Sequence, residues 1–222
     1  MRIAAEFVRS AASAADFPTD ECPEVAFVGR SNVGKSSLIN ALTRQRIART
    51  SGAPGKTRLV NIYRVTRGDL ELYLVDLPGY GFATGGPKAA EEFDRLTRDY
   101  FARATAAPAA LLLVDSRHPG MESDRAAWQW LRSAAGAAAI VATKTDKLAR
   151  GQRIRAMREL ESVFEHAVTP VSAVTGEGLD ELWKLMDRLA NRDDRNSSSR
   201  RSRKPSPMGR PAPTSPRPKA KR

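Results

Sequence analysis

The sequence predicts a three-layer α/β fold, in which helices cover both faces of a mostly parallel sheet of six strands. Two observations support this prediction. Short apolar runs of strand length alternate along the chain with longer runs of helical periodicity. Residues 29–36 also form a G-x-x-x-x-G-K-S segment between an apolar run and a helical run, and glycine-rich turns of this kind join a strand to a helix in such folds.

The predicted elements follow one another along the chain. Strands are expected at residues 24–28, 59–66, 70–76, 110–115, 140–143 and 167–171, and helices at residues 37–44, 88–104, 122–135, 151–164 and 179–190. Only Arg67, Gly68 and Asp69 separate the second strand from the third, and this link is too short for a crossover. These two strands are therefore expected to form an antiparallel hairpin at one edge of the sheet.

Composition divides the chain into three parts. Residues 1–22 are expected to be an N-terminal extension packed on the domain, residues 23–191 the domain itself, and residues 192–222 a disordered tail. The tail combines eleven Lys and Arg residues with six prolines and several serines, and it has almost no large apolar side chains. It therefore cannot bury enough surface to offset the entropy of ordering. It also carries +9 of the net charge of +12, which leaves the domain nearly neutral.

The segment at residues 29–36 has the spacing of a phosphate-binding loop for a nucleoside triphosphate. In such a loop, backbone N–H groups and the N-terminus of the following helix face the phosphates. Lys35 is expected to contact the β- and γ-phosphate oxygens, and the Ser36 hydroxyl to ligate Mg²⁺. Glycine at positions 29 and 34 lets the backbone approach the anion. The alternative is a chance glycine-rich turn, which the flanking strand and helix disfavour.

Further motifs identify the base and the metal. Asp76 ends an apolar strand, where it can hold a Mg²⁺-bound water, and the N–H of Gly79 can meet the γ-phosphate. Thr57 can complete the Mg²⁺ shell. The Asp146 carboxylate can accept two hydrogen bonds from the N1–H and 2-amino groups of guanine, which adenine does not offer. A backbone N–H within residues 171–173 can meet guanine O6. The sequence therefore predicts GTP and GDP as ligands.

Taken together, the segments GRSNVGKSSLINAL, PGKTRLVNIY, VDLPGYGFA, TKTD and VSA resemble the EngB (YihA/YsxC) family of ribosome-biogenesis GTPases, in the TrmE-Era-EngA-EngB-septin-like class of P-loop GTPases. The resemblance covers roughly residues 3–190. It implies a P-loop GTPase domain with Mg²⁺ as cofactor and slow GTP hydrolysis. It also implies a role in late assembly of the large ribosomal subunit, with precursors made of ribosomal RNA and proteins as partners.

The motifs and the resemblance together predict the site residues. Nucleotide binding is expected at Gly29, Arg30, Ser31, Asn32, Val33, Gly34, Lys35, Ser36, Ser37, Gly55, Lys56, Thr57, Arg58, Leu59, Asp76, Leu77, Pro78, Gly79, Thr143, Lys144, Thr145, Asp146, Val171, Ser172 and Ala173. The predicted catalytic residues are Asn32, Lys35, Thr57, Asp76 and Gly79. Ser36 and Thr57 are expected to ligate Mg²⁺ directly, and Asp76 through water.

Three positions bear on how this site differs from that of Ras-like GTPases. Tyr80 stands where those enzymes carry a glutamine, and it has no amide with which to orient water. In related GTPases an asparagine at the position of Asn32 helps bind K⁺, so we hypothesise that K⁺ stimulates hydrolysis. Alternatively, Asn32 only tolerates the backbone conformation of a tight loop. Thr143 replaces the usual asparagine of Asn-Lys-x-Asp, which leaves base choice intact but weakens the hydrogen bonds around the base pocket.

Two basic segments are candidates for contact with RNA. The tail at residues 192–222 suits a polyanion through phosphate contacts, or it is a solvated extension that aids solubility. The segment at residues 44–58 has five basic residues and no acidic one. It either contacts RNA or surrounds the nucleotide phosphates with positive charge.

Several classes of protein are disfavoured. Cys22 is the only cysteine, so an internal disulfide is impossible and a reducing compartment is expected. The longest small or apolar stretch, residues 134–142, is far shorter than the ~18 residues of a membrane span. Residues 1–22 lack the apolar core of a signal peptide. His118 and His166 have neither metal-ligand nor triad spacing.

These observations support a GTP-dependent assembly factor for the large ribosomal subunit, cytoplasmic and monomeric. A second hypothesis is an RNA-binding module in which the basic tail carries the function and the nucleotide is a structural ligand. A third is a related GTPase that acts in tRNA modification or in cell division and septation.

Overall fold

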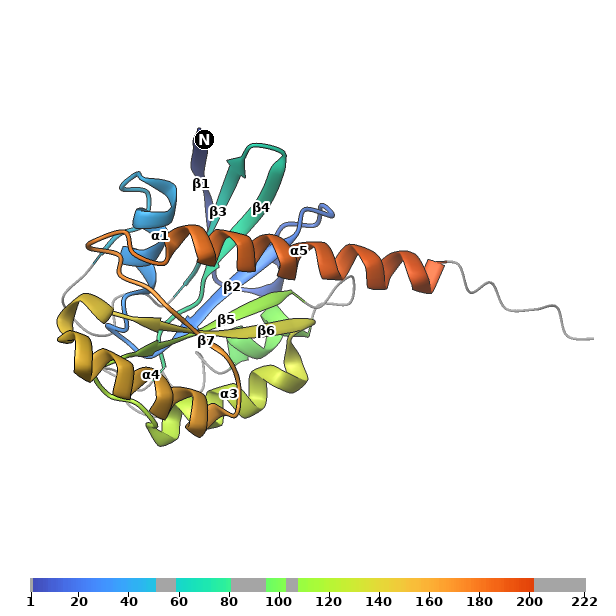
Figure 1. The fold of residues 1–222 in the computed structure, drawn as a ribbon. Coiled ribbons are helices and arrows are strands. Elements are labelled where there is room, and N and C mark those ends of the chain that lie inside the picture. The colour runs from blue at the N-terminus through green and yellow to red at the C-terminus, as the bar shows by residue number, and fades with distance from the viewer. Residues whose placement is uncertain (1, 51–58, 81–94, 103–107, 202–222) are drawn as a thin grey trace, which may run out of the picture.

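The computed structural model describes residues 2–50, 59–80, 95–102 and 108–201, with side chains described up to Asn191. Seven strands form one sheet: β1 (Ile3–Ala11), β2 (Glu24–Gly29), β3 (Val60–Arg67), β4 (Leu70–Asp76), β5 (Ala109–Asp115), β6 (Ala137–Thr143) and β7 (Val168–Pro170). Their order across the sheet is β1-β3-β4-β2-β5-β6-β7 (Figure 1). In this order, the strands β4, β2, β5, β6 and β7 run parallel to one another. The predicted α/β class with a mostly parallel sheet is confirmed.

The predicted number of six strands is wrong, because part of the N-terminal extension is a strand. β1 pairs antiparallel with β3, from Ile3 opposite Arg67 to Ala11 opposite Val60, with an irregularity between Phe7 and Arg9. The predicted β3–β4 hairpin is present and antiparallel, but β1 forms the edge of the sheet outside it. Most side chains of β1 are exposed or half-buried. The strand therefore lacks the apolar run by which the other strands are recognised.

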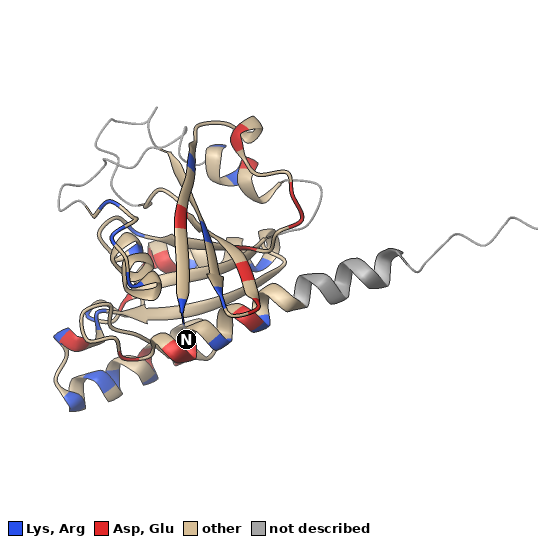
Figure 2. Ribbon diagram, turned by 90° about the horizontal axis from the view of Figure 1, so that it is seen from above, with Lys and Arg blue, Asp and Glu red and all other residues tan. Residues whose placement is uncertain are grey.

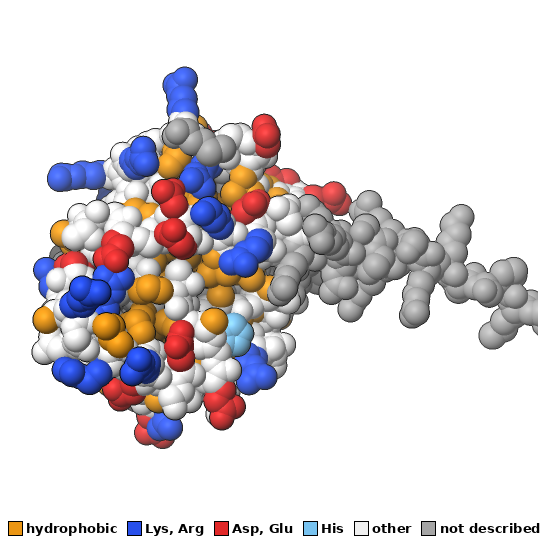
Figure 3. Space-filling view, in the orientation of Figure 1, with side chains coloured by type: hydrophobic (Ala, Val, Ile, Leu, Met, Phe, Trp, Pro, Cys, Tyr) orange, Lys and Arg blue, Asp and Glu red, His pale blue; other side chains and the backbone are white. Residues whose placement is uncertain are grey.

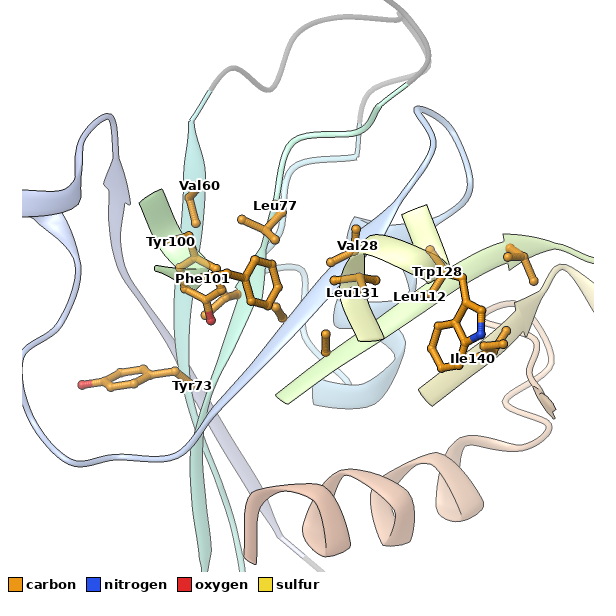
Figure 4. Close-up of a cluster of buried hydrophobic side chains, with 14 of the residues drawn as sticks. Val28, Val60, Tyr73, Leu77, Tyr100, Phe101, Leu112, Trp128, Leu131 and Ile140 are labelled. Carbon is orange, nitrogen blue, oxygen red and sulfur yellow. The ribbon is translucent and has the colours of Figure 1, made fainter. Parts of the chain in front are cut away.

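Helices cover both faces of the sheet, as predicted (Figure 1). They comprise α1 (Lys35–Thr43), α3 (Glu122–Ala134), α4 (Arg150–Phe164), α5 (Leu179–Arg201) and a helical stretch at residues 95–101. One apolar cluster joins α3, α4 and residues 95–101 to the sheet, and Figure 4 shows part of it around Tyr100, Trp128 and Leu131. A second cluster joins α1 and α5 to the opposite face through Leu38, Trp183 and others. The fold thus has three layers.

Helix α5 is longer than predicted. It continues to Arg201, past the predicted helix end at residue 190 and past the predicted start of the tail at residue 192. Residues 192–201 are polar, but they contain neither glycine nor proline, and the first proline beyond them is Pro205. Nothing in this stretch therefore breaks the helix. The rest of the predicted tail, residues 202–222, lies outside the described residues.

The topology brings five loops to one edge of the sheet. Because β2, β4, β5, β6 and β7 are parallel, the segments that follow them all leave the sheet at the same side. This is the edge at which open α/β sheets bind their ligands. Within the described part of the chain, no helix has the length and apolar composition needed to cross a membrane.

Candidate functional site

The loop between β2 and α1 has the backbone conformation of a phosphate cradle. Asn32 and Gly34 have φ angles of 62° and 108°, and Gly34 is the N-cap of α1. A side chain at Gly29 would meet the Leu113 carbonyl oxygen at 2.8 Å, so this position also requires glycine. The loop therefore turns tightly at the positive end of α1, where N–H groups and the helix dipole favour an anion.

Lys35 is the first residue of α1, and its side chain reaches back to this loop. Its ammonium donates to the carbonyl oxygens of Gly29 at 3.1 Å and Arg30 at 3.3 Å, and the residue is only 8% exposed. Burial lowers the pKa of Lys35, and the nearby Asp76 opposes this shift. A cation desolvated to this degree interacts strongly with any phosphate that reaches the loop. The predicted role of Lys35 is consistent with this position.

Ser36 and Asp76 lie side by side, as a shared metal site requires. The Ser36 hydroxyl donates to Oδ2 of Asp76 at 2.9 Å. The other carboxylate oxygen of Asp76 is buried and has no hydrogen-bond partner. Burial raises the pKa of Asp76, against the opposing effects of Lys35 and Ser36. Mg²⁺ prefers oxygen ligands. The Ser36 hydroxyl and the unpartnered carboxylate oxygen of Asp76 are ligands of this kind, so these residues fit the ion.

The segment after Asp76 lies directly against the phosphate-binding loop. The Ser31 N–H donates to the Tyr80 carbonyl at 3.0 Å, and the Ser31 hydroxyl donates to the Gly79 carbonyl at 3.2 Å. A side chain at Gly79 would meet Ser31 N at 2.7 Å and the Lys35 ammonium at 2.9 Å. Glycine is therefore required here by close approach to the loop and to the Lys35 ammonium.

Hydrogen bonds join the predicted base motif, at residues 143–146, to the phosphate-binding loop. The buried Thr143 hydroxyl lies 2.7 Å from the Val33 carbonyl and 3.1 Å from the Val114 carbonyl. Lys144 has a φ angle of 60°, and its ammonium donates to the Asn32 carbonyl and to Asp115, the latter at 3.0 Å. Threonine at position 143 therefore still joins the two loops, although its one hydroxyl proton serves only one carbonyl at a time.

Asp146 is oriented by the loop after β7. The Ser172 hydroxyl donates to Oδ1 of Asp146 at 2.7 Å and accepts the N–H groups of Val174 at 3.2 Å and Thr175 at 3.1 Å. Lys147 forms an ion pair with Oδ2 of Asp146 at 3.3 Å. The hydrogen bond from Ser172 is the main cause that lowers the pKa of Asp146. The carboxylate is therefore ionised at neutral pH, as an acceptor of the guanine N–H groups must be.

Two residues of this edge were missed by sequence reasoning. Arg117 donates to both carboxylate oxygens of Asp115, at 2.9 and 2.8 Å, and Asp115 also binds Lys144. Burial alone would raise the pKa of Asp115, but these hydrogen bonds hold it well below its usual range. Asp115 thereby fixes the Lys144 side chain next to the phosphate-binding loop. Its place at the carboxyl end of a fully buried strand was the available signal.

The structure brings most of the predicted site together. Residues 29–37, 76–79, 143–146 and 171–173 occupy the same sheet edge, and hydrogen bonds connect the neighbouring loops. Gly55, Lys56, Thr57 and Arg58 lie outside the described residues, so the predicted second Mg²⁺ ligand is not placed. Leu59 is 39% exposed, just ahead of β3.

Comparison with known proteins points to the same chemistry. A family model described as "50S ribosome-binding GTPase" matches residues 24–144. A probable GTP-binding protein EngB from Chlorobaculum parvum is 42% identical over 186 residues, which is 82% of this chain and 95% of the relative. A second one, from Thermotoga maritima, is 43% identical over 188 residues, with coverages of 83% and 95%.

Solved structures agree with the fold. The crystal structure of a probable GTP-binding protein EngB superposes with a TM-score of 0.60 at 25% identity, over 76% of this chain and 99% of that one. Era from Aquifex aeolicus, bound to GDP and AlF4⁻, superposes with a TM-score of 0.66 at 22% identity, over 77% of this chain and 57% of Era, and supports the fold alone. The family model and the sequence relatives, set beside the phosphate-binding and base loops, show that this chain belongs to the EngB family of P-loop GTPases.

Proposed function

We propose that this GTPase is a nucleotide-dependent switch that acts in assembly of the large ribosomal subunit. One observation carries the proposal: the phosphate-binding loop touches both the base motif, through Thr143, and the segment after Asp76, through Ser31. A change at the γ-phosphate can therefore reach the segment that follows Asp76. The description of the matching family as ribosome-binding supports the partner. Such a partner implies a cytoplasmic location, and the protein acts as a monomer.

In this proposal each part of the site has one task. Lys35 and the loop N–H groups stabilise the charge on the phosphates, and Asp146 selects guanine. Ser36 and Thr57 hold Mg²⁺, with Asp76 acting through water, and the ion neutralises charge on the β- and γ-phosphates. GTP orders the segments around Thr57 and Gly79, the ordered form binds a ribosomal precursor, and hydrolysis releases it.

Hydrolysis is slow without an activator, because Tyr80 offers no amide to orient water. In addition, K⁺ bound near Asn32 stimulates turnover. The Asn32 side chain is exposed and so available for such an ion. Steady-state GTP turnover in K⁺ and in Na⁺ buffers of equal ionic strength tests this. Equal rates would contradict it, and an Asn32→Ala variant should abolish any K⁺ effect.

The second candidate is an RNA-binding module that relies on the basic tail. Basic and acidic residues are interspersed over the described part of the chain (Figure 2), and the face in Figure 3 also carries both signs. The strong positive charge lies in residues 192–222. In this alternative, RNA binding depends on the tail and not on the nucleotide.

One experiment separates the two candidates. Tagged protein is sedimented with ribosomal particles in the presence of GTP, GDP or no nucleotide, both as the full chain and truncated after Arg201, which leaves α5 intact. The switch predicts retention on large-subunit precursors with GTP only, with or without residues 202–222. Nucleotide-independent retention that disappears on truncation would favour the binding module. Association with division-site proteins in place of ribosomal particles would favour a role in septation.

A further inference from the structure

One buried carboxylate near the site has no role in the functions described above. Asp124 lies in the first turn of α3, and its side chain is 1% exposed. The Tyr80 hydroxyl donates to Oδ1 of Asp124 at 2.8 Å, and Nε of Arg30 lies 3.2 Å from the same oxygen. Three distant parts of the chain therefore meet at this carboxylate: the phosphate-binding loop, the segment after Asp76, and α3.

The buried Asp124 carboxylate depends on its two partners. Burial raises the pKa of Asp124, and the contacts with Tyr80 and Arg30 oppose that shift. Burial, reinforced by Asp124, also raises the pKa of Tyr80, so the phenol keeps its proton and donates it. The second oxygen of Asp124 is buried without a partner. A buried carboxylate is stable only while its partners remain in place, so Asp124 holds both Tyr80 and Arg30.

The position in which Tyr80 is held matters for the nucleotide. The Tyr80 carbonyl accepts the Ser31 N–H at 3.0 Å, and residues 30 and 80 form a parallel bridge. Gly79 lies so close to the Lys35 ammonium that a side chain there would approach it to 2.9 Å. The Gly79–Tyr80 segment therefore accepts a hydrogen bond from one N–H group of the loop and fills the space beside Lys35. A γ-phosphate has to enter this space, whereas GDP ends one phosphate short of it.

We propose that Asp124, Tyr80 and Arg30 form a latch that holds the Gly79–Tyr80 segment on the phosphate-binding loop and so favours GDP over GTP. The latch rests on the proposed assignment of this loop as the nucleotide site. GTP binding has to move the segment off the loop and break the Tyr80–Asp124 hydrogen bond before the γ-phosphate can order the segment in its new position, and GDP binding does not. Asp124 is thus a positioning residue that sets the nucleotide preference of the resting protein.

Tyr80→Phe tests the latch because it removes one hydroxyl and keeps the ring. Affinities for GDP and for a non-hydrolysable GTP analogue are measured by displacement of a fluorescent guanine nucleotide from the full chain. A hydrogen bond to a carboxylate is strong enough that its loss should shift the affinity ratio about tenfold towards the GTP analogue. Asp124→Asn, which keeps the size and removes the charge, should shift the ratio in the same direction. If Tyr80→Phe does not fold, Asp124→Asn alone tests the proposal.

Tyr73→Phe is the matched control. The Tyr73 hydroxyl donates to Oδ2 of Asp20, also at 2.8 Å, but Tyr73 pairs with Glu24 at the opposite end of β2 from the loop. Its ratio should equal that of the wild type. The latch is overturned if Tyr80→Phe leaves the ratio within about twofold of the control, or if it shifts the ratio towards GDP. Wild-type protein that binds neither nucleotide would instead overturn the site assignment, and the latch with it.

Discussion

Ser172→Ala is expected to weaken guanine nucleotide binding without affecting the phosphate-binding loop. Ser172 is fully buried, and its hydroxyl makes three hydrogen bonds: one to the Asp146 carboxylate at 2.7 Å and two from backbone N–H groups. A hydrogen bond to a charged group contributes about 1.5–3 kcal/mol. If the loss of this hydrogen bond lowers the free energy of GDP binding by the same amount, GDP binds about 10- to 150-fold more weakly.

The assay is a calorimetric titration with GDP at several pH values. The carboxylate must be ionised to accept the guanine N–H groups, so affinity falls as the pH drops through the pKa of Asp146. Ser172 is the main cause that lowers this pKa, so its removal should raise the pKa and move the loss of affinity to higher pH. Ser133→Ala, on the exposed face of α3, is the matched control. Unchanged GDP affinity in Ser172→Ala at every pH would refute the role given to Ser172 in orienting the Asp146 carboxylate.

Three further predictions concern the same edge of the sheet. Asp146→Asn should shift preference from guanine to xanthine nucleotides, measured by competition, because an amide donates where xanthine offers a carbonyl; retained guanine preference would contradict it. Gly79→Ala should move the ratio of the two affinities towards the GTP analogue, because its methyl meets Ser31 N at 2.7 Å while the Gly79–Tyr80 segment lies on the loop; an unchanged ratio would contradict it. Thr143→Val should lower the free energy of unfolding by about 1–3 kcal/mol in chemical denaturation, because the buried Val33 carbonyl loses its donor; unchanged stability would contradict it.

Much of the fold was predictable from local pattern. The strands β2, β4, β5 and β6 are buried over most of their length, so each appears in the sequence as an apolar run. In β3, buried apolar residues are interspersed with half-buried and exposed polar ones. The short link at residues 67–69 was enough to predict the hairpin. β1 was not predictable in this way, because its side chains are mostly exposed and its partner β3 lies far along the chain. Only the pairing of its backbone with β3 makes it a strand.

The functional site was likewise predictable from the sequence only in part. Motif spacing indicated Lys35, Ser36, Asp76 and Asp146, because the chemistry of phosphate, Mg²⁺ and guanine restricts the residue types at those positions. Spacing did not indicate Asp115, whose role depends on Lys144 reaching it from another loop. Nor could it indicate that the Thr143 hydroxyl and the Lys144 ammonium link the base motif to the phosphate-binding loop.

The sequence by itself determined the fold class, the ligand and the family, because these depend on local periodicity and on motifs that are contiguous in the chain. Only the tertiary structure decided how the motifs act on one another. The contact between Tyr80 and Asp124 joins residues 44 positions apart, and Asp124 alone looks like an ordinary helix position. Folding buries the Asp124 carboxylate and brings Tyr80 and Arg30 to it. The hydrogen bond and the ion pair therefore form only in the folded chain.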